Sequence, residues 1–180
     1  IQISRHGGPG TDTDLFLRGA NKQHTAVYVD GIRIDAQNGS GGAPWESLSL
    51  ESIERVEVLR GAAGAVYGSD AMAGAVQIFT RRGEPGFNPY VSVGAGTHGT
   101  QKSTAGFSGG QGAWDYALGL SYADSEGFDA KTGGPKRNVD KDGYVRKSAN
   151  ARVGLQLSAS QRLDFTALTS DSNAGYDSRA

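Results

Sequence analysis

Strict alternation of side-chain character in the C-terminal half constrains the fold more than any other feature of this sequence. From Trp114 to Tyr122 every second residue is aromatic or apolar, and the residues between them are small, hydroxylated or acidic. Successive side chains of a β-strand point to opposite faces, so the segment predicts a strand with one apolar and one polar face. The same pattern recurs at 148–157 and 162–167, and more weakly at 90–96 and 101–109.

Two architectures satisfy this alternation. In a soluble β-domain the apolar face turns to a core, whereas in an outer-membrane barrel it turns to lipid and the polar face lines a wet interior. Segments of about 10 residues, with Trp114 and Tyr122 near the two ends of one of them, favour the barrel. Alternation by itself leaves the soluble all-β domain open.

Composition narrows the class further. The chain holds 28 glycines in 180 residues, dispersed rather than repeated, which is typical of turns and close backbone contacts in a β-rich fold. A net charge of -1 provides no positive field for nucleic acid, so nucleic acid is not expected as a partner. There is no cysteine and no run of about 18 apolar residues, so any membrane contact must be made by strands.

The N-terminal half predicts a small α+β domain. Thr25–Val29 and residues 32–34 form a predicted hairpin, because Asp30-Gly31 is a pair that tolerates the positive φ angles of a type I′ turn. Pro44 and residues 47–53 predict a short helix, and residues 55–60 and 75–80 predict two further strands.

Four strings in this half carry a family resemblance. They are DLFLRGAN from Asp14, AVYVDGIR from Ala26, IERVEVLRG from Ile53 and AVYGSDAMAGAVQI from Ala65. In this order they resemble the plug domain of TonB-dependent outer-membrane receptors. The resemblance implies an N-terminally truncated plug at residues 1–87, followed at 88–180 by the first strands, about five, of a large antiparallel transmembrane β-barrel.

The resemblance also implies a function. Such a receptor lies in the outer membrane of a Gram-negative bacterium, contacts its lipid and imports a scarce nutrient with energy delivered by the TonB complex of the inner membrane. TonB would engage a segment N-terminal to Ile1, and further barrel strands would follow residue 180, so we expect this chain to be a fragment. The run at 67–71 is most similar to the cobalamin receptor, while siderophore and haem receptors share much of the plug.

Ligand-contacting positions follow from the same similarity. Carried over from the cobalamin receptor, they fall in two polar loops, at Asp12, Asp14, Asn21, Gly39 and Ser40. An amide and a hydroxyl suit the amide-fringed edge of a corrin. The two aspartates depart from that pattern, and would suit a cationic group or cap a turn.

A calcium site is predicted in the long loop at 127–144. Asp140-Lys141-Asp142-Gly143 places two carboxylates beside a tight turn, which is how hard oxygen ligands are gathered around calcium. The loop resembles the calcium-binding extracellular loop of cobalamin receptors, with matching positions at Asp129, Asn138, Asp140 and Asp142 and a further ligand expected at Asp171 of the next loop. The alternative is a solvated acidic turn offset by the neighbouring lysines.

Two other classes of protein compete with the receptor. An enzyme needs converging titratable groups, but the three histidines and the absence of nucleophile or metalloprotease motifs give none, so no catalytic residue is expected. A soluble β-rich binding module explains the alternation but not the four plug-like strings.

Overall fold

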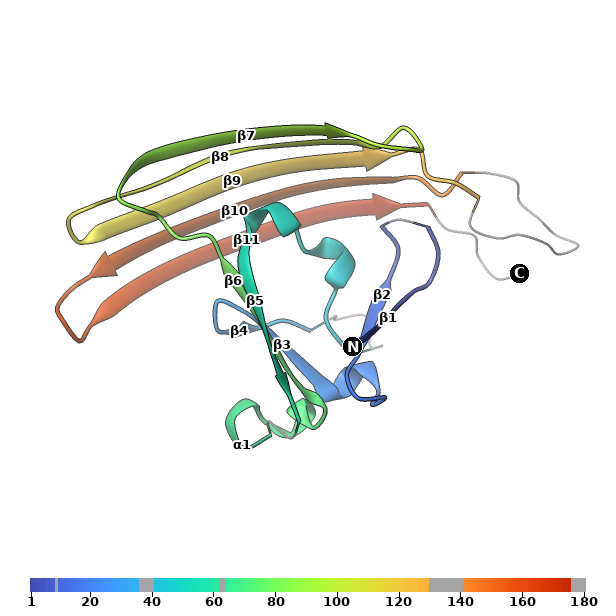
Figure 1. Ribbon diagram of the computed structural model, residues 1–180, viewed down its shortest axis with the longest axis horizontal. Helices are drawn as coiled ribbons and strands as arrows, with labels where there is room; N and C mark the ends of the chain where they lie inside the picture. Colours follow the sequence, from blue (N-terminus) through green and yellow to red (C-terminus); the bar gives the residue numbers. More distant parts are fainter. Residues whose placement is uncertain (9, 36–40, 62–63, 130–140, 176–180) are drawn as a thin grey trace, which may run out of the picture. The chain divides into compact units, whose positions relative to one another are not determined.

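The computed structural model describes residues 1–8, 10–35, 41–61, 64–129 and 141–175. The chain divides into two compact units. The first comprises Ile1–His6, Thr11–Leu48 and Ile53–Thr80, and the second comprises Gly7–Gly10, Ser49–Ser52 and Arg81–Ala180. Each unit is built around its own β-sheet (Figure 1). No helix of the described part is long and apolar enough to cross a membrane.

The first unit is an α+β domain. Its four-stranded sheet has the order β4-β3-β6-β5, in which β3 runs parallel to β6 and the other pairs are antiparallel. The strands are β3 (Thr25–Val29), β4 (Ile32–Arg33), β5 (Ile53–Arg60) and β6 (Gly74–Thr80). A separate antiparallel pair is formed by β1 (Gln2–Arg5) and β2 (Thr13–Phe16).

Short helices connect these strands. They are the 3-10 turns η1 (Lys22–His24), η2 (Trp45–Ser47), η3 (Leu50–Ser52) and η4 (Ser69–Ala71), and the single-turn helix α1 (Gly64–Tyr67). The short helix predicted at residues 47–53 is therefore two separate 3-10 turns. The chain is extended at Leu48, with φ -80° and ψ 126°, which interrupts helical hydrogen bonding between them.

The core of the first unit is thin and made of small and branched residues. Leu17, Val27 and Val76 are its largest fully buried side chains. Since neighbouring strand residues point to opposite faces, Ala26 and Ala75 form a second cluster with Ala71, and Tyr28 and Tyr67 pack against it. The ring centroids of Tyr28 and Tyr67 are 5.3 Å apart, so the two rings add aromatic contact area to this small cluster.

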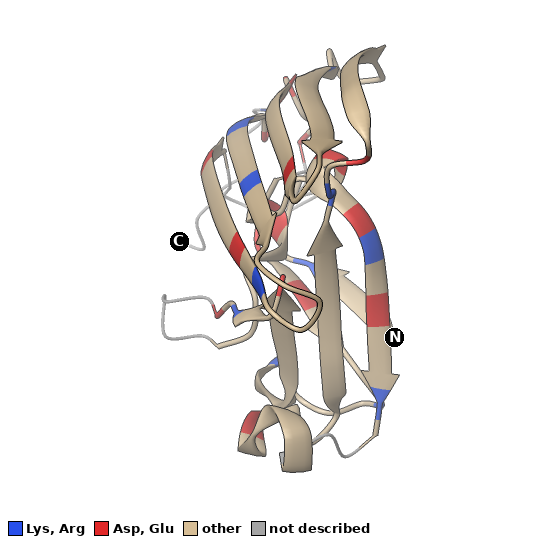
Figure 2. Ribbon diagram, turned by 90° about the vertical axis from the view of Figure 1, so that its left-hand side faces the viewer, with Lys and Arg blue, Asp and Glu red and all other residues tan. Residues whose placement is uncertain are grey.

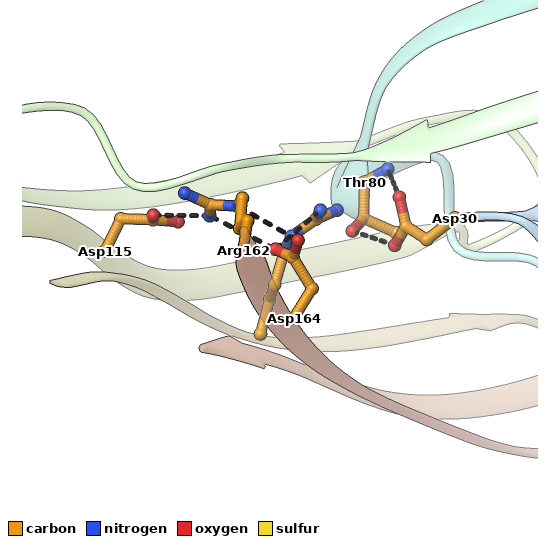
Figure 3. Close-up of polar contacts among 6 residues, drawn as sticks. Asp30, Thr80, Asp115, Arg162 and Asp164 are labelled. Atoms are coloured by element: carbon orange, nitrogen blue, oxygen red, sulfur yellow. Dashed lines mark hydrogen bonds and ion pairs between the residues drawn. The ribbon is translucent and has the colours of Figure 1, made fainter. Parts of the chain in front are cut away.

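The Asp30-Gly31 turn has the predicted conformation. Asp30 has φ 48° and Gly31 has φ 84°, as a type I′ turn requires. The Asp30 carboxylate also accepts hydrogen bonds from the backbone N–H of Thr80 at 3.0 Å and from its hydroxyl at 2.5 Å (Figure 3). This aspartate therefore joins the hairpin turn to the end of β6.

The second unit is an antiparallel meander. Its strands are β7 (Gly86–Ala95), β8 (Gln101–Gln111), β9 (Trp114–Ser125), β10 (Tyr144–Gln156) and β11 (Arg162–Ala174), and each pairs with the next (Figure 1). The five predicted strands are confirmed, and most are longer than the alternation indicated. The sheet is curved and unclosed, with β7 and β11 at its two edges.

The apolar face of this sheet is the exposed one. Trp114 and Leu120 are each 55% exposed and Leu118 is 37% exposed, whereas Ala117 and Ala123 on the opposite face are 6% exposed. The pairing continues the apolar face onto the neighbouring strands, where Phe107, Ala151 and Ala167 lie in line with Leu118. A water-soluble core would bury these side chains, so the sheet has the polarity of a lipid-facing barrel wall.

A charge placed on this face tests its environment. Leu118 is midway between Trp114 and Tyr122, so Leu118→Arg is expected to destabilise folding of the intact receptor into phospholipid vesicles by about 2–4 kcal/mol. Ser92→Arg is the matched control, because Ser92 is an exposed residue of the polar face. Equal folding free energies for the two variants would contradict the assignment of the faces.

Candidate functional site

Asp14, one of the predicted ligand contacts, lies in an internal charge cluster. It is 9% exposed, and its carboxylate is 2.7 Å from both the Lys22 ammonium and His6 Nε2. Burial opposes ionisation of Asp14, but hydrogen bonds and charge from Lys22 and His6 outweigh it and lower the pKa of Asp14. The cluster joins β2 to η1 and to His6, the residue that follows β1, so this aspartate has a structural partner on each side.

The other predicted contacts differ from Asp14 in exposure. Asp12 and Asn21 are exposed, and their backbone carbonyls accept hydrogen bonds from the N–H groups of His6 and His24. Asn21 precedes η1 without using its side chain as a cap. Gly39 and Ser40 lie outside the described residues.

The fold places Asp129 and Asp142 near one another, and it places Asp171 on a neighbouring strand. Asp129 and Asp142 lie at the two ends of the long loop, which come together because the Asp142 N–H donates to the Phe128 carbonyl at 3.2 Å. Asp171 is within β11, not in a loop, and it pairs with Lys147 of β10. Gly175 is four positions beyond Asp171, and its N–H donates to the Gly143 carbonyl. That strand length is about 13 Å, so the fold does not bring Asp171 to Asp142.

Asn138 and Asp140 lie outside the described residues. Within the described ranges, no three His, Asp or Glu side chains are grouped as a metal site.

A charge network on the polar face of the five-stranded sheet was not predicted. Arg162 contacts Asp115 at 2.5 Å and Asp164 at 2.9 Å, and Arg152 contacts Asp164 at 3.1 Å (Figure 3). The Arg152 side chain is only 4% exposed, whereas that of Asp164 is 31% exposed, so a buried guanidinium is paired here with a partly exposed carboxylate. The residues alternate in charge, which gives this part of the polar face a nearly balanced local charge.

Gly154 makes this network possible. Asp115, Gly154 and Asp164 lie side by side on β9, β10 and β11. A Cβ at Gly154 would be 1.9 Å from Arg162 Nη2, so a side chain at this position would displace the Arg162 guanidinium from its path across β10 to Asp115. The sequence does not reveal that Asp115, Gly154 and Asp164 are neighbours until the register of the three strands is known.

Charges also alternate along β5 of the first unit. The strand at the right of Figure 2 bears acidic and basic bands in turn, and Arg55 bonds to Glu57 at 2.8 Å and stacks on Phe79 at 3.8 Å. These are exposed ion pairs, which contribute little to stability but keep an edge strand polar.

Removal of the Asp14 charge is expected to weaken the β1–β2 pair. Because the pKa of Asp14 is lowered in the folded chain, its stabilisation is present above its ordinary pKa and is lost as the pH falls through the folded value. Asp14→Asn is expected to cost about 1–3 kcal/mol near neutral pH, since Lys22 loses its counter-ion.

Hydrogen exchange of the β1–β2 amides in the intact receptor measures this effect. The Asp14→Asn variant should lack the acid-dependent loss of protection below the ordinary pKa of aspartate. Asp12→Asn is the control, since Asp12 is exposed and its neighbours contact it through the backbone. Identical exchange in the wild type and Asp14→Asn would refute the role of the cluster.

Comparison with known proteins agrees with this architecture. Residues 1–75 match the family model for the TonB-dependent receptor plug domain. Among solved structures, the copper transporter OprC is 21% identical with a TM-score of 0.78, over 99% of this chain and 27% of the transporter. The pyoverdine outer membrane receptor FpvA of Pseudomonas aeruginosa PAO1 is 20% identical with a TM-score of 0.75, over 96% of this chain and 23% of the receptor.

A third solved structure, the siderophore receptor PirA of Acinetobacter baumannii, is 23% identical with a TM-score of 0.68, over 97% of this chain and 28% of the receptor. The chain thus spans roughly a quarter of these proteins, and the likeness at this identity is one of fold. A plug domain with barrel strands of this kind belongs to the outer membrane of Gram-negative bacteria. This chain has the fold of a TonB-dependent outer-membrane receptor, a plug domain followed by antiparallel strands of an unclosed barrel.

Proposed function

We propose that the protein takes part in active import of a scarce, metal-containing nutrient across the outer membrane, with energy supplied through TonB. The observation that carries the proposal is the polarity of the five-stranded sheet, whose apolar face is exposed and whose polar face holds Arg152 and its counter-ions. A wide barrel with a wet interior leaks unless a folded domain fills it, and a plug fold precedes these strands.

This role requires binding and transport, not bond chemistry. Two clusters of titratable groups are used in ion pairs, namely the His6, Asp14 and Lys22 cluster and the Arg162 network. None of these groups is presented to a substrate as an acid, base or nucleophile would be. We therefore propose a transporter and assign no catalytic residue.

The class of nutrient is inferred from two sources. Neighbouring folds are named for copper, ferric enterobactin and pyoverdine, which favours a metal ion or an iron siderophore. The sequence likeness at 67–71 favours cobalamin, but these residues have partners within the plug. Tyr67 packs on Tyr28, and Asp70 accepts a 2.6 Å hydrogen bond from Arg33. The run is thus accounted for by plug structure, and cobalamin and an iron siderophore both remain hypotheses.

Ligand contact is proposed for the exposed positions of the two polar loops. Asp12 and Asn21 present a carboxylate and an amide to solvent, and we retain Gly39 and Ser40 with them on the sequence similarity. Asp14 is proposed to act indirectly, because its carboxylate is held by Lys22 and His6. It would orient the loop between β1 and β2 that carries Asp12.

Growth of a deletion strain tests the function and the nutrient together. We expect deletion of the full gene to impair growth on limiting cobalamin or on a limiting ferric siderophore, and not in medium replete with both. Removal of TonB should reproduce the defect. Normal growth of the deletion strain under both limitations would reject import of either nutrient.

We also propose calcium in the long loop of the second unit. Asp129 and Asp142 are brought together at the base of this loop, and carboxylate oxygens are the ligands that calcium prefers. Asn138 and Asp140 are proposed to complete the site from within the loop. Asp171 was predicted as a further ligand, and its pairing with Lys147 does not support that role.

Calorimetry on the intact receptor tests the calcium proposal. Calcium is expected to bind with heat release, and an Asp140→Asn, Asp142→Asn double variant is expected to lose this binding. Asp171→Asn serves as the control and should bind calcium as the wild type does. An absence of calcium uptake by the wild type would reject the site.

A further inference from the structure

The segment Ser49–Ser52 belongs to a different unit from the residues on either side of it. In sequence it lies between Thr11–Leu48 and Ile53–Thr80, which form the plug, yet its contacts group it with the five-stranded sheet. It contains η3 (Leu50–Ser52) and the serine that precedes it. The chain therefore leaves the plug unit for four residues and returns to it.

A directed chain of hydroxyl groups connects this segment to two barrel strands. The Ser49 hydroxyl donates to the Glu51 carboxylate at 2.7 Å and lies 2.9 Å from the Ser121 hydroxyl of β9. Ser121 in turn lies 2.6 Å from the hydroxyl of Ser148, its direct neighbour on β10.

The direction of this chain follows from the number of protons. A hydroxyl has one proton, and Ser49 gives its proton to a carboxylate that can only accept. Ser121 must therefore donate to Ser49, and Ser148 must donate to Ser121. Each bond polarises the next toward the negative charge of Glu51, which strengthens the series.

Basic residues of the same face reinforce this arrangement. Lys102 of β8 and Arg146 of β10 are the two cross-strand neighbours of Ala123 on β9. Burial opposes ionisation of Glu51, but the Ser49 hydrogen bond, the backbone and the charges of Arg146 and Lys102 lower its pKa. The carboxylate thus remains charged within the field of two cations that belong to the sheet.

The segment has a second connection at its C-terminal end. Ser52, which is 6% exposed, accepts a 3.0 Å hydrogen bond at its carbonyl from the N–H of Arg81. The Arg81 guanidinium lies 5.3 Å above the ring of Tyr90 on β7. Tyr90 extends over Gly106 and Gly119, where a Cβ would lie 2.5–2.6 Å from its hydroxyl oxygen. Contacts therefore reach the sheet at β7, β9 and β10.

We propose that Ser49–Ser52 is a fixed attachment of the plug sequence to the barrel wall, which stays bound while other parts of the plug move during transport. The proposal rests on the proposed function, because it concerns the motion that TonB drives. The segment acts as a boundary. When plug residues N-terminal to Ser49 are displaced, Ser49 stays bound to the wall.

A disulfide between Ser49 and Ser121 tests the attachment in the full-length receptor in cells. Because the two hydroxyl oxygens lie 2.9 Å apart, Ser49→Cys, Ser121→Cys is expected to form a cross-link. Uptake of radiolabelled cyanocobalamin and of radiolabelled ferric enterobactin is measured before and after reduction. The probe that the wild type imports should enter the oxidised variant without loss.

Controls separate the attachment from general effects of oxidation. Ala151→Cys, Ala167→Cys joins two directly opposed residues of β10 and β11, within the wall alone. It should form a cross-link and import the probe as the wild type does. Failure of the Ser49–Ser121 cross-link to form, or a loss of uptake that reduction restores, would overturn the attachment.

A second measurement keeps this test independent of the nutrient. Maleimide labelling of the single variant Ser49→Cys should be slow and equal in cells with and without active TonB, because the residue stays against the wall. Faster labelling when TonB is active would overturn the proposal. If neither probe enters the wild type, the proposed function fails, whereas the cross-link and labelling results still report on the attachment.

Discussion

The exposed apolar face of the five-stranded sheet determines how the rest of the second unit is built. Lipid removes the need to bury Trp114, Leu118 and Leu120, and it leaves the opposite face to meet water and other protein groups. That polar face must then accommodate charged and hydroxyl groups at close range. The fold does so with small residues such as Ala117 and Ala123, which leave room for long polar side chains from neighbouring strands.

Charged groups at one end of the polar face form ion pairs with other residues of the same sheet. Arg162 reaches two carboxylates on different strands, and Gly154 provides the space for its crossing. These ion pairs are partly exposed except at Arg152, and they connect β9, β10 and β11 in the register that the strand pairing shows.

The first unit uses a different solution, because its core is too thin to rely on apolar burial alone. Its largest fully buried side chains are one leucine and two valines. Polar connections supplement them at the ends of strands, where Asp30 holds Thr80 and Asp14 holds Lys22 and His6. Such connections can be broken one at a time, which suits a domain proposed to be displaced by force.

The sequence alone determined the strands from Thr25 onward, the Asp30-Gly31 turn, the α+β character of the first half and the resemblance to a plug, because these depend on local periodicity and turn chemistry. It did not determine which side chains meet. The Arg162 network, the Ser49–Ser121–Ser148 chain and the separation of Asp171 from Asp142 depend on register between strands and on contacts between residues far apart in the chain. Local pattern carries no information on such pairings, so only the tertiary structure decided them.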